Sequence, residues 1–229
     1  MNQIIAMHGW AGHAGLWYQW KRVLEQDGWL WQSAERGYGS APPWTPSWRH
    51  GPGERVVIAH SLGLHLLTEE QLKHATAIAL LGCFPSFVPA GPAGRALRAG
   101  LRGMRTALGS EGECIMLQRF FAKAAAPLSI NALPASPLLA GLSVAGRQRL
   151  GGDLSLLERC CGLPAAWPQA ARVLVVQGAK DAVVAETCQQ QLLDLLDSQD
   201  CQICRDQRWG HALLTTDVLT VVHAWLRKR

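Results

Sequence analysis

A serine, an aspartate and a histidine that could act together on a carbonyl group occur in that order along the chain. Ser61 ends the apolar run 55–60 and begins the helix-forming stretch "SLGLHLL". A serine on such a strand-to-helix turn has a strained backbone that lifts its hydroxyl above the edge of a sheet. Asp181 follows the strand-like "RVLVVQG", and His211 follows the last strand-like run. The pattern predicts a nucleophile, an acid that orients a base, and the base.

Small residues flank the serine, as a sharp turn requires. The usual pattern has glycine two residues before and two residues after the nucleophile. Here these positions are Ala59 and Gly63. Because strand and helix backbones pass close together at such a turn, one extra methyl group is a smaller obstacle than a larger side chain. We expect Ala59 to be neutral for activity.

The backbone near the serine offers candidates for an oxyanion hole. The stretch "MHGWAG" follows the first strand-like run and can aim an N–H group at the charge that develops in acyl transfer. The predicted donors are the N–H groups of Trp10 and Leu62. Simpler explanations exist, because Asp181 could cap a helix and His211 could be a capping or core residue. The joint order of the four segments favours chemistry.

Two further expectations concern neighbouring polar residues. His60 is expected to face away from the reacting atoms, because it alternates with Ser61 along the strand. Asp153, Asp206 and Asp217 are alternative acids, but none follows a strand end as directly as Asp181.

The elements that must position these residues alternate along the chain. Apolar runs typical of strands lie at residues 4–7, 29–32, 55–60, 75–82, 172–178 and 201–204. Segments of helix length lie at residues 14–26, 62–73, 185–197 and 213–227. Most of the runs are continuously apolar, as in strands that are covered on both faces. The alternation predicts an α/β fold with a mostly parallel sheet of about six strands flanked by helices.

One long segment, residues 83–168, breaks this alternation. It contains no strand-like run, and its helical patterns lie around residues 94–107, 112–125 and 144–161. We therefore expect a helical lid at 83–168, inserted into a core that is formed by residues 1–82 and 169–229.

The motifs resemble those of the α/β-hydrolase superfamily and, within it, the pimeloyl-[acyl-carrier protein] methyl ester esterases of biotin synthesis. The likeness is carried by "MHGWAG" (7–12), "RGYGSA" (36–41), "AHSLG" (59–63), "QGAKDAVV" (177–184) and "WGHA" (209–212). Within the lid, "QRFFA" (118–122) and "LGGDLSLL" (150–157) are also similar. Several basic lid positions of that family have no counterpart in "INALPASPLLAG", and the stretch after "RGYGSA" is too short for the usual helix.

The resemblance implies a serine carboxylesterase, without cofactor, that hydrolyses the methyl ester of pimeloyl-[acyl-carrier protein]. Ser61, His211 and Asp181 would form the catalytic triad. Trp10 and Leu62 would bind the substrate together with Phe120, which would line an acyl channel. A general short-chain carboxylesterase or a thioesterase would use the same residues. A non-catalytic binding module with this fold is a further alternative.

Positive charge is concentrated in the lid. The net charge is +5, and residues 83–165 hold nine Lys or Arg against four Asp or Glu, a difference equal to the net charge. Such a lid would attract an acidic carrier protein; the alternative is a solvated face that keeps the lid soluble. Arg119 matches the carrier-binding motif of the family. The other candidates are Lys123 and three arginines at helical spacing: Arg95, Arg98 and Arg102.

The remaining composition excludes several classes of protein. Seven cysteines without an export signal are expected to be free thiols in a cytoplasmic protein. Cys201 and Cys204 would point to opposite faces of a strand, so we expect no metal. No run approaches the roughly 18 apolar residues that cross a membrane, and no nucleic-acid-binding signature is present. We expect a monomer that binds a carrier-linked acyl ester.

Overall fold

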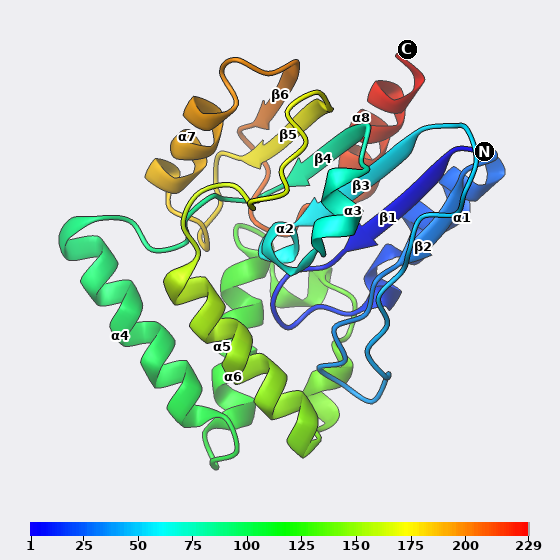
Figure 1. Ribbon diagram of the computed structural model, residues 1–229. Coiled ribbons are helices and arrows are strands. Elements are labelled where there is room, and N and C mark those ends of the chain that lie inside the picture. Colours follow the sequence, from blue (N-terminus) through cyan, green and yellow to red (C-terminus); the bar gives the residue numbers. More distant parts are fainter. Residues whose placement is uncertain (229) are drawn as a thin grey trace.

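The computed structural model describes residues 1–228 and has one parallel sheet at its centre (Figure 1). In this described part, six strands are ordered β2-β1-β3-β4-β5-β6, and every neighbouring pair is parallel. The strands are β1 (Gln3–Met7), β2 (Leu30–Ser33), β3 (Arg55–His60), β4 (Ala77–Leu81), β5 (Arg172–Gly178) and β6 (Cys201–Asp206). The predicted α/β fold with a mostly parallel sheet is confirmed.

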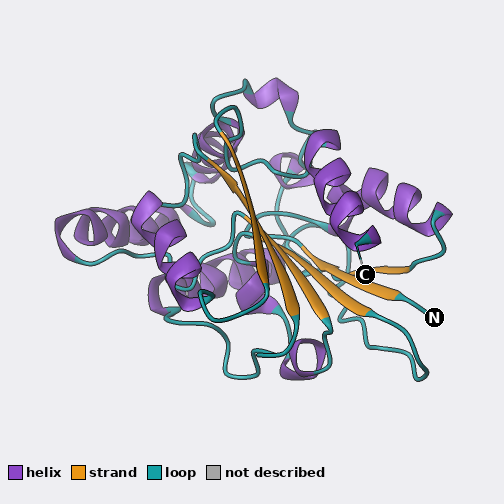
Figure 2. Cartoon of the chain, turned by 90° about the horizontal axis from the view of Figure 1, so that it is seen from above, coloured by secondary structure: helices purple, strands orange, loops and turns teal. Residues whose placement is uncertain are grey.

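Both faces of the sheet are covered by helices, as Figure 2 shows along the twisted strands. Neighbouring residues of β3 therefore belong to different apolar clusters: Val56 packs on one face and Val57 on the other. This explains why the strand sequences are continuously apolar rather than alternating. Four of the amino-terminal tryptophans, Trp17, Trp20, Trp29 and Trp31, fill the core on the Val56 side.

Within residues 1–228, five helices flank the sheet. They are α1 (Tyr18–Gln26), α2 (Gly63–Leu66), α3 (Glu69–Lys73), α7 (Glu186–Leu195) and α8 (Thr216–Arg227). The single helix expected over 62–73 is wrong, because Leu67 is extended and the chain restarts at Thr68. The Thr68 side chain accepts a hydrogen bond from the Gln71 N–H, and the Gln71 side chain accepts one from the Thr68 N–H. This capping box starts a new helix.

Three helices lie between β4 and β5 in the chain and beyond the carboxyl ends of the strands (Figure 1). They are α4 (Gly91–Ala107), α5 (Glu113–Ala125) and α6 (Val144–Arg159). Short 3-10 turns at Ile130–Ala132 and Pro137–Ala140 connect α5 to α6. Leucines of these helices, including Leu101, Leu117 and Leu150, form a third apolar cluster with Trp10 and Leu62. This cluster joins the helices to the loops around Ser61.

A buried carboxylate attaches α6 to the loop after β2. Asp153 accepts two hydrogen bonds from the Arg36 guanidinium, both at 2.7 Å, and one from the Tyr38 hydroxyl at 2.6 Å. A two-pronged contact of this kind fixes orientation as well as distance. Asp153, one of the alternative acids of the sequence, therefore holds the inserted helices in place.

The two cysteines of β6, Cys201 and Cys204, lie on opposite faces of the sheet. Cys201 packs with the apolar cluster on one face of the sheet and Cys204 with the cluster on the other. Their placement agrees with the strand geometry expected from the sequence. In residues 1–228, no helix is long and apolar enough to cross a membrane.

Gly146 at the start of α6 offers a test of how closely α6 packs on the loop after β2. A Cβ atom there would lie 2.1 Å from the Tyr38 carbonyl oxygen. We expect Gly146→Ala to lower the free energy of unfolding by about 1–3 kcal/mol in urea denaturation, because backbone must move to admit the methyl group.

Gly152 in the same helix provides the matched control. A Cβ atom on it would meet no atom within 4 Å. Gly152→Ala should therefore raise the free energy of unfolding by about 0.5–1 kcal/mol. Equal free energies of unfolding in the two variants would show that α6 does not pack tightly against the loop at Tyr38.

Candidate active site

Ser61 sits on a sharp turn between β3 and α2. Its φ angle is +56°, in the left-handed region that residues other than glycine rarely adopt, and its N–H donates to the Leu81 carbonyl at 2.9 Å. A Cβ atom on Gly63 would lie 2.5 Å from the Met7 carbonyl oxygen, so only glycine fits there. Ala59 is completely buried in the apolar cluster with Val57. The strained turn expected from the sequence is present.

Three residues from distant parts of the chain meet at this turn. The His211 Nε2 atom lies 3.0 Å from the Ser61 Oγ atom, and the His211 Nδ1 atom lies 2.8 Å from the Asp181 Oδ2 atom. Asp181 follows β5 and His211 follows β6, so the carboxyl ends of the strands bring them together. His211 and Ser61 are buried, with 2% and 7% of their surface exposed. A nucleophile, a base and an orienting acid need this geometry.

Asp181 does not cap a helix, as the simpler explanation supposed, because α7 begins only at Glu186; its side chain instead holds the turn that follows it. Its second carboxylate oxygen, Oδ1, accepts hydrogen bonds from the N–H groups of Val183 and Val184 at 2.7 and 2.9 Å. Burial by itself raises the pKa of the Asp181 carboxyl, but the charge and hydrogen bond of His211 and these two N–H groups outweigh burial. The pKa of Asp181 therefore lies below its ordinary value, and the group is a carboxylate at neutral pH.

The loop after β1 passes directly over Ser61. A Cβ atom on Gly9 would lie 2.8 Å from the Ser61 Cβ atom. Within residues 1–228, the N–H groups of Trp10 and Leu62 donate to no protein acceptor. They are therefore free to bind an oxyanion. The Leu62 side chain is fully buried in the third apolar cluster, and Leu62 lines neither cavity, so its predicted side-chain contact with substrate is not found.

Glu35, which the sequence did not single out, holds this loop. The Glu35 carboxylate accepts hydrogen bonds from the N–H groups of Ala14 and Gly37 at 2.8 and 2.7 Å. His8 donates from Nδ1 to the Gly9 carbonyl and accepts at Nε2 from the Arg36 N–H. The sequence feature that could have identified Glu35 is its position after the carboxyl end of β2, because the loops at this edge of such sheets surround the functional site.

The expectation for His60 is wrong. His60 lines the same cavity as Ser61, and its ring centroid lies 5.1 Å from that of His211. Strand alternation does not predict its direction because the backbone leaves strand geometry at the next residue, where φ is +56°. The His60 Nε2 atom lies 3.0 Å from the His211 carbonyl oxygen and donates to it. His60 thereby helps to hold the loop that carries His211.

The cavity at Ser61 has a volume of about 500 Å³. Its floor includes Ser61, His60 and His211, and Trp10 and Phe120 form part of its wall. The segment 128–139 of the insertion covers it with apolar side chains such as Leu128, Ile130, Leu133 and Leu139. A cavity of this size and character suits a small or medium-sized apolar group.

The basic residues of the insertion have different surroundings. Arg105 pairs with Glu158 and Arg147 with Glu113, so these two cations join the three helices to one another. Arg119 and Lys123 on α5 line a second cavity, described below. Arg95, Arg98 and Arg102 lie on α4 and line neither cavity.

The half-buried His60 makes stability depend on pH. Burial, followed by the nearby charge of His211, lowers the pKa of His60 to about 3, whereas an unfolded histidine titrates near 6.5. Between these values the unfolded chain binds a proton that the folded chain does not, so stability falls as the pH drops from about 6.5.

We expect His60→Gln to flatten the dependence of the free energy of unfolding on pH between 7 and 4.5, by at most about 1.4 kcal/mol per pH unit. Urea denaturation across this range is the measurement, and the exposed His50→Gln is the control. If both variants keep the wild-type slope, His60 is not held neutral in the folded chain.

A scan against protein-family models finds no match, and a search of curated protein sequences finds none either. Solved structures, in contrast, are similar over nearly the whole chain. The esterase EaEST from Exiguobacterium antarcticum has a TM-score of 0.72 and 14% identity, with 100% of this chain and 92% of that chain covered. A thermophilic esterase from Thermogutta terrifontis has a TM-score of 0.68 and 14% identity, and the match covers 100% of this chain and 90% of that chain.

A bromoperoxidase from Bacillus anthracis is also similar, with a TM-score of 0.69, 12% identity and coverage of 98% of this chain and 90% of that chain. Likeness at this level of identity speaks of the fold rather than the activity. The chain has the α/β-hydrolase fold that its motifs predicted.

Proposed function

We propose that the chain is a serine hydrolase that cleaves carboxylic esters. The observation that carries this proposal is the continuous pair of hydrogen bonds from Ser61 through His211 to Asp181, at 3.0 and 2.8 Å, beside an apolar cavity. Such an arrangement activates a serine hydroxyl, which is a weak nucleophile by itself. The esterases among the structural neighbours support the same reaction class.

Each group has a defined part in the proposed reaction. The Ser61 oxygen attacks the ester carbonyl carbon while His211 Nε2 takes the hydroxyl proton. The negative oxygen of the tetrahedral intermediate accepts hydrogen bonds from the Trp10 and Leu62 N–H groups. His211 then gives its proton to the departing alcohol, and water releases the acid from the serine in the reverse sequence. Asp181 stabilises the charged imidazole and keeps Nδ1 protonated.

The inserted segment 83–168 would act as a lid over this site. Residues 128–139 supply one wall of the Ser61 cavity, and the Trp10 Nε1–H group donates to the Leu150 carbonyl of α6 at 3.0 Å. The residue whose backbone would bind the oxyanion is thus attached by its side chain to the lid. Exclusion of water by such a cover strengthens the electrostatic contacts inside.

The narrower substrate that we propose is the methyl ester of pimeloyl-[acyl-carrier protein]. It is supported by the resemblance of the motifs and by the cations exposed on the insertion, including Arg95, Arg102 and Arg119. An acidic carrier would be attracted to them mainly through a faster, salt-sensitive association. A short-chain carboxylesterase or a thioesterase would need the same serine but not these cations.

The serine chemistry can be tested with a fluorophosphonate probe. We expect the probe to label wild type at Ser61 and to leave Ser61→Ala unlabelled, with Ser47→Ala as a folded control that is labelled normally. Hydrolysis of p-nitrophenyl butyrate should fall by about a thousandfold or more in Ser61→Ala and in Asp181→Asn, because the three groups act as a unit. A protein that binds the ester without probe labelling or turnover would be a binding module instead.

The narrower substrate calls for a separate experiment. A biotin auxotroph that lacks its pimeloyl-ester esterase should grow when it expresses wild type and fail to grow with Ser61→Ala. Growth with wild type alone would support the carrier-linked ester. Absence of growth, from a protein that still cleaves p-nitrophenyl butyrate, would reject this substrate in favour of a general carboxylesterase.

A further inference from the structure

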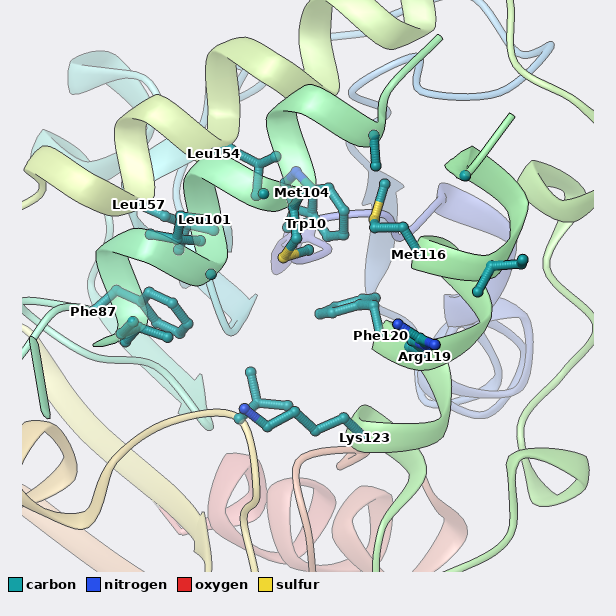
Figure 3. A pocket seen from close by; sticks show the side chains of 17 residues that line it. Trp10, Phe87, Leu101, Met104, Met116, Arg119, Phe120, Lys123, Leu154 and Leu157 are labelled. Atoms are coloured by element: carbon teal, nitrogen blue, oxygen red, sulfur yellow. The ribbon is translucent and has the colours of Figure 1, made fainter. Parts of the chain in front are cut away.

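A second cavity lies between the helices of the insertion (Figure 3). Its volume is about 680 Å³, and α4, α5 and α6 all contribute to its walls. Phe87, Leu101, Leu154 and Leu157 lie on one side, and Phe120 points into it from α5 on the other. Met104 and Met116 add flexible, polarizable surface that adapts to different chain shapes. The interior therefore suits an apolar chain without polar branches.

Two aromatic rings stand between this cavity and Ser61. Trp10 and Phe120 line both cavities, and their rings meet edge to face with centroids 4.7 Å apart. The Trp10 indole is held by its hydrogen bond to the Leu150 carbonyl. A molecule can therefore occupy the second cavity without contacting Ser61, which lines only the first.

The charge at the second cavity is entirely positive. Arg119 and Lys123 line it, and in Figure 3 the Lys123 side chain extends from α5 below the other labelled side chains. No carboxylate among the described residues lines it, and neither cation forms a salt bridge within residues 1–228. Arg105 and Arg147 of the same helices are both paired. The two unpaired cations beside apolar walls match an anion attached to an apolar chain.

We propose that this cavity is a binding site for a straight-chain carboxylate of the fatty-acid type, separate from the Ser61 cavity. The chain lies against Leu101, Met104 and Leu154, and the carboxylate pairs with Lys123 and Arg119. The site does not depend on the proposed ester hydrolysis, because Ser61, His211 and Asp181 do not line it; it shares only Trp10 and Phe120 with the Ser61 cavity.

The test uses full-length Ser61→Ala protein, so that binding is measured without turnover. A fluorescent fatty acid is bound first, and dodecanoate is then added to displace it. We expect displacement with one binding site per chain, and we expect dodecanol, which has the same chain without the charge, to displace the probe at least about fivefold less well.

Glycines on the insertion allow the cavity to be filled without new strain. A Cβ atom on Gly103, which lines the cavity, would meet no atom within 4 Å. Gly103→Leu should therefore fold and weaken dodecanoate binding by about tenfold or more. Gly152→Leu is the matched control, since Gly152 is an open helical position that lines neither cavity.

The roles of the Arg119 and Lys123 charges are tested with further substitutions in the Ser61→Ala protein. Arg119→Gln with Lys123→Gln should weaken dodecanoate about tenfold and leave dodecanol unchanged, whereas Arg102→Gln should leave both unchanged. Wild-type affinity in Gly103→Leu would overturn the proposal, because the ligand would then occupy the Ser61 cavity or the surface. Equal affinity for dodecanoate and dodecanol would overturn the assignment of the anion.

Discussion

The turn at Ser61 is the constraint on which the surrounding structure depends. Its left-handed backbone is held between β3 and β4 by the bond from its N–H to Leu81. The turn can exist only because Gly63 carries no side chain against the Met7 carbonyl and Gly9 none against Ser61 itself. Three backbone segments thus lie closer together than side chains would allow, and strain of this kind persists only where its surroundings enforce it. The hydroxyl that results points at His211 rather than into the core.

Stability and function share the same contacts around this turn. The Asp181 carboxylate uses one oxygen to orient His211 and the other to accept two backbone N–H groups. His60 belongs to β3 and also holds the carbonyl of His211. A change at either residue therefore alters the position of the imidazole together with the stability of a loop, and the two effects have to be measured separately.

The insertion is attached to the core by polar contacts as well as by leucines. Asp153 of α6 binds Arg36 and Tyr38, while the Leu150 carbonyl accepts from the Trp10 indole. The first contact ends on the loop after β2, and the second ends on the loop after β1, which passes over Ser61. Movement of α6 would therefore displace Trp10, which belongs both to the proposed oxyanion hole and to the wall between the two cavities.

Sequence alone determined the parallel sheet, the turn at Ser61 and the identity of the residues that meet there. Apolar runs, small residues and positions after strand ends are local features, and parallel strands gather their carboxyl ends at one edge. The direction of His60, the anchoring role of Asp153 and the second cavity were decided only by tertiary structure. They depend on contacts between residues far apart in the chain, such as Arg36 with Asp153 and Trp10 with Phe120, whose pairing no local pattern encodes.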